Sequence, residues 1–248
     1  ESSKWNNYYD EITSIKSTSK TMDSLPTDAQ VLGELKRNGK ATDIVVCAAG
    51  SLPGELHKLW RTEQTGGYHA EYGFSCMGYE IAGGLGVKMA EPEREVIVLV
   101  GDGSYLMLNS ELATSVMLGQ KIIVVVLDNR GFSCINRLQN ATGNRSFNNL
   151  LKDCESIDDG HPNVNFALHA QSLGANSEHI ENINELASAL GRARLSSKSY
   201  LISLVTDSHK ISPEGGCWWE VAVPEVSSNK NGGEVYNSYK KGKKQQPY

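Results

Sequence analysis

The sequence has little of several features that would place it in a specialised class of proteins. Its 248 residues include five cysteines, an odd number with no C-x-x-C pair. Together with the position of Cys47 inside an apolar run, this count indicates buried thiols in a reducing cytoplasm rather than a disulfide framework. No apolar run approaches the ~20 residues that span a membrane. A formal net charge of −5 argues against a nucleic-acid partner. We therefore expect a soluble cytoplasmic protein.

Two common enzyme signatures are also missing. No G-x-G-x-x-G follows a predicted strand, which argues against a nicotinamide site. The stretches GFSCM (73–77) and GFSCI (131–135) lack the final glycine of G-x-S-x-G, so serine hydrolase chemistry is not expected. Four histidines show no metal-ligand spacing and receive no role: His161, His169, His179 and His209.

What the sequence does contain is an alternation of short apolar strands and helices. Strands are predicted at 43–50, 96–100, 122–127 and 200–205, and helices at 28–39, 77–90, 110–118, 166–175 and 183–195. Runs of Val, Ile and Leu are typical of parallel strands buried on both faces, and strand–helix–strand units form right-handed crossovers. The pattern predicts an α/β fold with a doubly wound, mainly parallel sheet flanked by helices.

The predicted sheet occupies the middle of the chain. Residues 1–26, rich in Ser, Thr and Lys without clear periodicity, are interpreted as a linker or an arm from a preceding domain. Residues 27–226 are predicted to form one domain, in which the polar segment 133–163 is an irregular active-site loop. Residues 227–248, with the run KKGKK, are predicted to be a solvated tail. Because the sequence starts at Glu1, we expect a piece of a longer protein.

Two of the predicted strands are each followed by a side chain that can bind a cation. Asp102 follows the strand at 96–100, and Asn129 follows the strand at 122–127. If these strands are neighbours, their carboxyl ends lie about 5 Å apart at the edge where parallel sheets bind ligands. An oxygen pair without nearby Cys or His favours magnesium or calcium over zinc. Magnesium commonly keeps phosphate oxygens as further ligands, so a phosphorylated ligand is expected.

The residues around Asp102 fit such a ligand. Gly101 and Gly103 would let the backbone approach a diphosphate, and Ser104 offers a hydroxyl group. Each feature alone is common in turns. Their combination at a strand end predicts a diphosphate site.

These residues carry a family resemblance. The stretch GDGS (101–104), 24 residues between Gly103 and Asp128, and then DNRGF (128–132) resemble the magnesium and diphosphate motif of thiamine diphosphate-dependent enzymes. The resemblance implies that Asp102, the Asn129 side chain and the Gly131 carbonyl bind magnesium. The family usually has asparagine where this chain has Asp128, which is not the usual metal ligand.

The resemblance implies further cofactor contacts. Met77, in SCMG (75–78), would support the bent form of thiamine diphosphate, and Ser51 and Leu52, in AAGSLPG (48–54), would contact its diphosphate. The family's activating glutamate comes from a separate pyrimidine-binding domain, often of a partner subunit. Nothing in this chain resembles that domain, so we expect the diphosphate-binding portion of a homo-oligomeric enzyme, inactive alone.

Longer stretches narrow the resemblance to one branch of the family. They are AAGSLPGELHKLW (48–60), YHAEYGFSCMGYEIAGG (68–84), GDGSYLMLNSEL (101–112), LDNRGFSCINRLQ (127–139) and WWEVAVPEVS (218–227). They resemble the branch that hydrolyses a carbon–carbon bond of a cyclic diketone during myo-inositol breakdown. This implies trihydroxycyclohexane-1,2-dione as substrate and 5-deoxyglucuronate as product.

Three titratable residues are candidates for substrate binding or proton transfer. His57, His69 and Glu80 lie in stretches expected to face the cleft. Each could equally be a hydrogen-bonded structural residue.

Two other functions stay open. An acetolactate-synthase-like carboligase would share the cofactor motif and differ in its acceptor. A doubly wound module without catalytic activity would bind a nucleotide or only assemble with partners.

Overall fold

The structure is a computed structural model that describes residues 2–15, 25–153, 163–212, 223–229 and 231–245. The chain forms two compact units. The first consists of residues 1–130 and 163–212, and the second of residues 131–162 and 213–248. The sequence-predicted domain 27–226 therefore contributes residues to both units.

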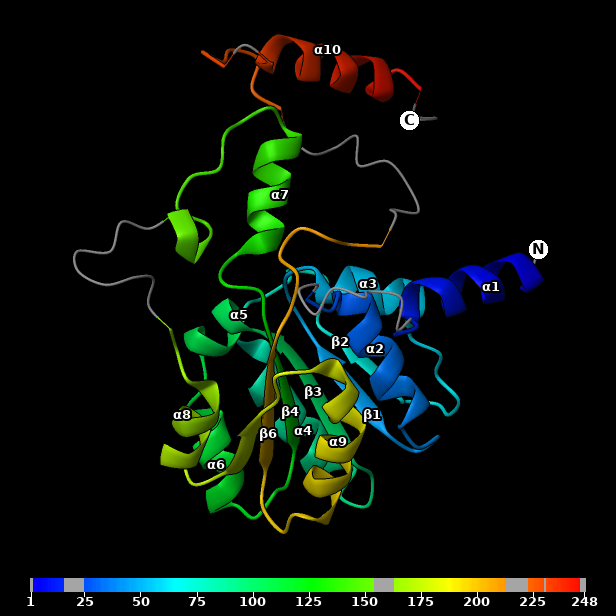
Figure 1. The fold of residues 1–248 in the computed structure, drawn as a ribbon, viewed down its shortest axis with the longest axis vertical. Helices are drawn as coiled ribbons and strands as arrows, with labels where there is room; N and C mark the ends of the chain where they lie inside the picture. The colour runs from blue at the N-terminus through cyan, green and yellow to red at the C-terminus, as the bar shows by residue number, and fades with distance from the viewer. Residues whose placement is uncertain (1, 16–24, 154–162, 213–222, 230, 246–248) are drawn as a thin grey trace. The chain divides into compact units, whose positions relative to one another are not determined.

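The first unit is built on a six-stranded sheet in the order β2-β1-β3-β4-β6-β5 (Figure 1). All five strand pairings are parallel. The strands are β1 (Ile44–Cys47), β2 (Tyr68–Ala70), β3 (Val96–Gly101), β4 (Ile123–Asp128), β5 (Asn176–His179) and β6 (Tyr200–Val205). The doubly wound α/β prediction is confirmed.

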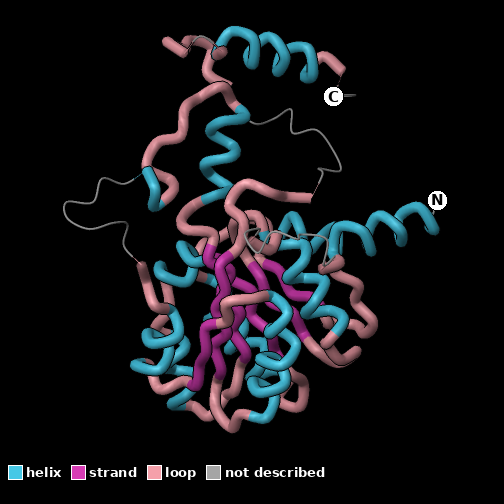
Figure 2. The backbone as a smooth tube through the Cα atoms, in the orientation of Figure 1, coloured by secondary structure: helices cyan, strands magenta, loops and turns pink. Residues whose placement is uncertain are grey.

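Helices cover both faces of this sheet, so that strands lie between helices (Figure 2). One face packs against α2 (Asp28–Arg37), α3 (Leu52–Leu59) and α9 (Leu186–Leu195). The other packs against α4 (Tyr79–Ala90), α5 (Asp102–Met107), α6 (Glu111–Met117) and α8 (Phe166–Ser172). Successive strand residues alternate between the two cores, because neighbouring side chains of a strand point to opposite faces. Val125 joins the first core and Val124 the second.

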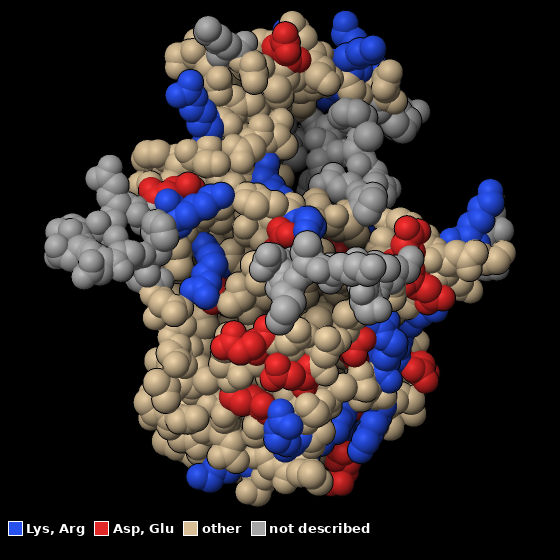
Figure 3. All heavy atoms as spheres, in the orientation of Figure 1, with Lys and Arg blue, Asp and Glu red and all other residues tan. Residues whose placement is uncertain are grey.

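A group of ion pairs lies at the amino ends of the strands, where Asp43 is buried and the other members are half-buried. Arg194 Nη2 lies 2.5 Å from Asp43 Oδ2, just before β1, and Arg194 Nη1 lies 3.8 Å from Glu95. Lys121 Nζ lies 3.3 Å from the same glutamate, just before β4. Asp43 and Glu95 therefore each have a cationic partner at this edge. Elsewhere on the first unit, acidic and basic side chains are interspersed on the face drawn in Figure 3.

Three segments for which no helix was predicted contain one, and the prediction that 133–163 is irregular was wrong. The linker or arm at 1–26 and the solvated tail at 227–248 stay predictions. Within the predicted linker 1–26, α1 (Ser2–Thr13) is a helix whose Tyr9 and Thr13 are buried. Within the predicted loop 133–163, α7 (Ser133–Ala141) is a helix, and α10 (Gly232–Lys243) lies in the predicted tail. Their polar composition concealed them, because polar residues outnumber apolar ones in each of these helices.

Short elements complete the two units. The first unit also contains the 3-10 helix η2 (Ile183–Glu185). The second unit contains the 3-10 helix η1 (Leu151–Asp153) in addition to α7 and α10. In the second unit Gly131 forms an antiparallel bridge with Leu150, and Phe132 N–H donates to Asn149 O at 2.7 Å. No helix in the described ranges has the length and apolar character that crossing a bilayer requires.

The prediction of buried thiols is confirmed for one cysteine and wrong for another. Cys47 is fully buried in β1, whereas Cys76 is exposed in the turn before α4. Cys134 is half-buried. Cys154 and Cys217 lie outside the described residues.

Candidate functional site

The predicted ligand residues lie on segments that follow adjacent strands. β3 is the neighbour of both β1 and β4, and Gly101 pairs with Leu127 in the β3–β4 register. Asp102 therefore directly follows the carboxyl end of β3, and Asn129 directly follows the carboxyl end of β4. No strand intervenes between them. The neighbouring strands that the cation hypothesis needs are present.

Both side chains are buried at this carboxyl edge of the sheet. Asp102 is 4% exposed and Asn129 is 9% exposed. The Asn129 Oδ1 atom has no hydrogen-bond donor among the described residues. A buried amide oxygen without a donor costs about 1–3 kcal/mol. A cation held at this edge would supply the missing positive partner, so the donor set fits a magnesium ion.

The turn that carries Asn129 is fixed by its two neighbours. Arg130 adopts a left-handed backbone conformation, with φ of 62°. Its N–H donates to Asp128 Oδ1 at 3.0 Å, and its Nε lies 3.3 Å from Asp128 Oδ2. Its Nη1 also donates to Asn163 at 2.7 Å. Burial raises the pKa of the Asp128 carboxyl, and Arg130 opposes that shift. The acid at position 128 thus shapes the turn that presents Asn129.

A second buried carboxyl joins three segments at the same edge. Glu80, in the first turn of α4, is 1% exposed. It accepts hydrogen bonds from Ala49 N–H at 3.2 Å, from Gly78 N–H at 3.0 Å and from Ser104 Oγ at 2.8 Å. Burial raises its pKa, and these hydrogen bonds oppose the rise. Glu80 therefore connects the turn after β1, the turn before α4 and the first turn of α5.

The remaining predicted cofactor residues lie on these same turns. Ser51 precedes α3, and its Oγ donates to Asp28 at 2.8 Å, while Leu52 is buried at the first position of that helix. Gly103 lies in the first turn of α5. Met77 is half-buried. It lies before α4, whereas the predicted helix 77–90 had Met77 as its first residue. Gly131 is the first residue of the second unit, and its carbonyl stays a predicted ligand.

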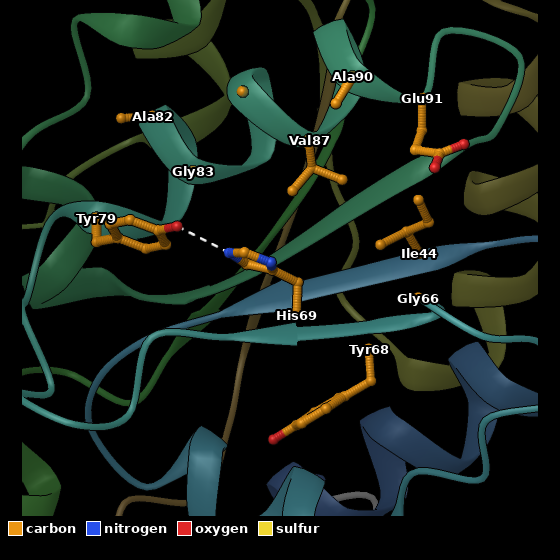
Figure 4. A pocket seen from close by; sticks show the side chains of 11 residues that line it. Ile44, Gly66, Tyr68, His69, Tyr79, Ala82, Gly83, Val87, Ala90 and Glu91 are labelled. Carbon is orange, nitrogen blue, oxygen red and sulfur yellow. Dashed lines mark hydrogen bonds between the residues drawn. The ribbon is translucent and has the colours of Figure 1, made fainter.

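The two predicted catalytic histidines lie on opposite sides of β2. His57, exposed on α3, has its Nδ1 3.3 Å from the hydroxyl of Tyr68. Burial raises the pKa of that phenol to about 12, so it stays protonated at neutral pH. His69 points the other way and has its Nε2 2.8 Å from the hydroxyl of Tyr79 on α4 (Figure 4). The structure does not bring the two imidazoles together.

A pocket of about 630 Å³ lies beside His69 rather than at the strand tips. Its lining runs from His69 and Tyr79 along α4 to Ala90 and Glu91, near Ile44 at the amino end of β1 (Figure 4). The lining is mostly apolar. This pocket is therefore separate from the turns that carry the predicted metal and diphosphate residues.

The chemistry of the strand-tip site is that of oxygen donors. Among the described residues, no group of three or more His, Cys, Asp or Glu side chains could hold a metal ion. A metal at the Asp102 and Asn129 tips would thus depend on one carboxylate supplemented by amide, carbonyl and ligand oxygens. Magnesium, which keeps water or phosphate oxygens in its shell, suits this set.

Sequence reasoning missed two features of the site. The partners of Glu80 were not expected, because Ala49 lies 31 positions earlier and Ser104 lies 24 positions later in the chain. The link between Asp128 and Arg130 was also missed. A signal was available for the second, since an aspartate in a turn commonly accepts a hydrogen bond from the backbone N–H two residues on, as Asp128 does from Arg130.

Comparison with known proteins assigns the chain to a family. Residues 48–204 match the family described as thiamine pyrophosphate enzyme, C-terminal TPP binding domain, where thiamine pyrophosphate is another name for thiamine diphosphate. This match covers more than half of the chain, which therefore belongs to that family.

Several relatives share one name. The chain is 40% identical over 216 residues to 3D-(3,5/4)-trihydroxycyclohexane-1,2-dione hydrolase of Bacillus cereus (strain AH820), covering 86% of this chain and 34% of that protein. The hydrolase of the same name from Clostridium tetani is 40% identical over 88% of this chain and 35% of its own length. That from Bacillus licheniformis is 43% identical over 80% and 31%. The chain thus spans about a third of the curated relatives it matches.

A solved structure supports the fold. The thiamine diphosphate-dependent 4-hydroxybenzoylformate decarboxylase of Rhodococcus jostii RHA1 superposes with a TM-score of 0.63. The superposition covers 75% of this chain and 34% of the decarboxylase at 18% sequence identity. At this identity the likeness extends to the fold alone.

Proposed function

We propose that this chain holds thiamine diphosphate through a magnesium ion at the carboxyl edge of its sheet. Asp102, the side chain of Asn129 and the carbonyl of Gly131 would ligate the metal. The observation that carries the proposal is the buried Asn129 Oδ1 atom, which lacks a donor among the described residues and follows the strand next to Asp102. Family membership supports the identity of the cofactor.

Other residues of the same edge would position the cofactor. Ser51, Leu52, Gly103 and Ser104 would contact its diphosphate, and the apolar side chain of Met77 would pack beneath its rings. The bound cofactor supplies a carbon nucleophile that also accepts the electron pair released when a carbon–carbon bond breaks. The protein contributes position and electrostatics.

We propose that the chain belongs to a hydrolase that opens trihydroxycyclohexane-1,2-dione to 5-deoxyglucuronate during myo-inositol breakdown. The shared name of relatives at about 40% identity supports this substrate. Three groups were predicted for substrate binding or proton transfer, of which His57 and His69 stay candidates, whereas Glu80 is only 1% exposed and is not proposed to meet the substrate. Because the two histidines lie on opposite sides of β2, we propose that at most one of them meets the substrate.

Activity would also need parts outside this chain. The relatives are about three times as long as the region they share with it. We propose that a pyrimidine-binding domain, from the same or another subunit of a cytoplasmic homo-oligomer, supplies the group that activates the cofactor.

A domain exchange tests the proposal. The matched third of the Bacillus licheniformis hydrolase would be replaced by this chain, and the product followed by NMR with thiamine diphosphate and magnesium present. We expect the chimera to open the dione and the 248-residue chain alone to show no steady turnover. Turnover by the chain alone would contradict the need for a second domain. Conversion of pyruvate to acetolactate, with the dione untouched, would instead identify a carboligase.

Cofactor binding is tested separately by titration calorimetry of the chain. We expect heat with thiamine diphosphate and magnesium together and much less without magnesium. No heat in either case would favour a module without catalytic activity.

A further inference from the structure

We infer that Glu80 is a positioning residue that fixes the geometry of three turns carrying proposed contacts to the cofactor and its metal. The inference rests on the proposed function and deepens it. Each of the three segments that Glu80 connects carries or adjoins a proposed cofactor residue. Ala49 lies two positions before Ser51, Gly78 directly follows Met77, and Ser104 is itself a proposed contact.

The hydrogen bonds make Glu80 the centre of this arrangement. Its Oε1 faces Ala49 N–H at 3.2 Å, and its Oε2 faces Gly78 N–H at 3.0 Å. Ser104 Oγ lies 2.8 Å from both carboxylate oxygens. The Gly78 N–H also lies 2.8 Å from Ser104 Oγ, so the three residues close a ring of contacts.

Backbone constraints make these contacts specific. Gly78 has a φ of 92°, a backbone conformation that residues with a side chain rarely adopt. A Cβ added there would lie 3.0 Å from the Cβ of Leu108. The turn before α4 is thus fixed both by the Glu80 carboxylate and by the segment after α5. A shift of Glu80 would move Met77 and Ser104 together.

The burial of Glu80 argues for positioning rather than direct chemistry. At 1% exposure the carboxyl has little access to a substrate. Both of its oxygens already accept hydrogen bonds from groups of the protein. Any effect of Glu80 on the cofactor would therefore act through Ser104 and the two turns.

The network requires a carboxylate rather than a side chain of the same shape. A glutamine would keep one acceptor oxygen and place an NH₂ group at the other position. That NH₂ group would face either Ala49 N–H or Gly78 N–H, and two donors repel each other. Glu80→Gln should thus distort one turn although its volume is unchanged.

The test compares two buried carboxylates in the full 248-residue chain. Glu80→Gln is matched by Asp43→Asn, which alters a buried carboxylate at the opposite edge of the sheet. Affinity for thiamine diphosphate with magnesium is measured by titration calorimetry, and the melting temperature of each unliganded variant is measured alongside. We expect Glu80→Gln to weaken cofactor binding about tenfold, a typical loss for a residue that orients a metal-site ligand. Asp43→Asn should bind like the wild type although it melts at a lower temperature.

A second variant keeps the test independent of folding. Ser104→Ala removes the hydroxyl that joins Glu80 to α5 and should weaken binding severalfold. The double variant should lose clearly less affinity than the sum of the two single losses, because both changes break one network. Wild-type affinity in Glu80→Gln and Ser104→Ala, or fully additive losses, would overturn the inference. Binding that fails in the wild-type chain would overturn the proposed function as well, which separates the two failures.

Discussion

The amino ends and the carboxyl ends of the strands, called here the amino edge and the carboxyl edge of the sheet, differ in how their polar side chains are partnered. At the amino edge, the buried Asp43 and the half-buried Glu95 are matched by Arg194 and Lys121, so that both carboxylates have cationic partners within the protein. At the carboxyl edge, Glu80 accepts hydrogen bonds from neutral donors, and Asn129 Oδ1 has no donor among the described residues. We infer that the amino edge serves stability, and we propose that the carboxyl edge keeps acceptor capacity for a ligand.

The largest expected effect is at the carboxyl edge. Asp102→Ala should reduce magnesium-dependent binding of thiamine diphosphate by more than about 100-fold, because even residues that only orient a metal ligand contribute 10–100-fold. Titration calorimetry with and without magnesium measures the change. If the variant still binds with full magnesium dependence, Asp102 is not a metal ligand and the two edges do not differ in the way described.

At the amino edge the effect should fall on stability instead. Asp43→Asn leaves Arg194 with only the more distant Glu95 and should lower the free energy of unfolding by at least about 2 kcal/mol. Urea denaturation measures this loss. Cofactor affinity at a temperature well below the transition should stay unchanged, and a weakened affinity would show that the edges are coupled.

Asn129 offers a sharper form of the comparison. Asn129→Leu removes a buried oxygen that lacks a donor, so the unliganded chain should keep its stability or gain up to about 1 kcal/mol. Its magnesium-dependent binding should nevertheless fall. Thermal unfolding of the variant with and without both ligands reports the two effects at once. A clear destabilisation of the unliganded variant would mean that Asn129 is needed for folding.

The smallest expected effect is a pH dependence. Burial raises the pKa of Glu80 above its ordinary value of 4.5, so the folded state binds its proton more tightly than the unfolded state. The stability of the wild type relative to Glu80→Gln should thus be greatest below that ordinary value. It should decline as the pH rises through the raised pKa. Urea unfolding of both proteins from about pH 4 to about pH 7 measures the difference. A flat difference curve would show an unperturbed carboxyl.

The central strands were predictable because they are buried on both sides. The predicted strand 96–100 corresponds to β3 (Val96–Gly101), and 122–127 corresponds to β4 (Ile123–Asp128). The edge strands β2 (Tyr68–Ala70) and β5 (Asn176–His179) were missed, since they are short and contain no run of Val, Ile or Leu. An edge strand is specified by its neighbour's backbone more than by its own composition.

The residues of the site also differ in whether the sequence could locate them. Asp102 and Asn129 could be located from sequence because each directly follows an apolar strand, and the tips of neighbouring parallel strands meet. The environment of Glu80 could not be found in this way. Its partners come from turns far apart in the chain, and only the packing of α4 and α5 against the sheet brings them together.

The register of β4 limits where insertions and deletions can be accepted during the evolution of this domain. Both faces of the strand are buried, with Val125 and Val124 in different cores, so deleting one residue would exchange the two faces. Asn129 would then be displaced from its place beside the end of β3. The turn at Gly119, outside the strands, carries no such constraint. Insertions and deletions in natural variants should accordingly accumulate in that turn and spare the six residues before Asn129.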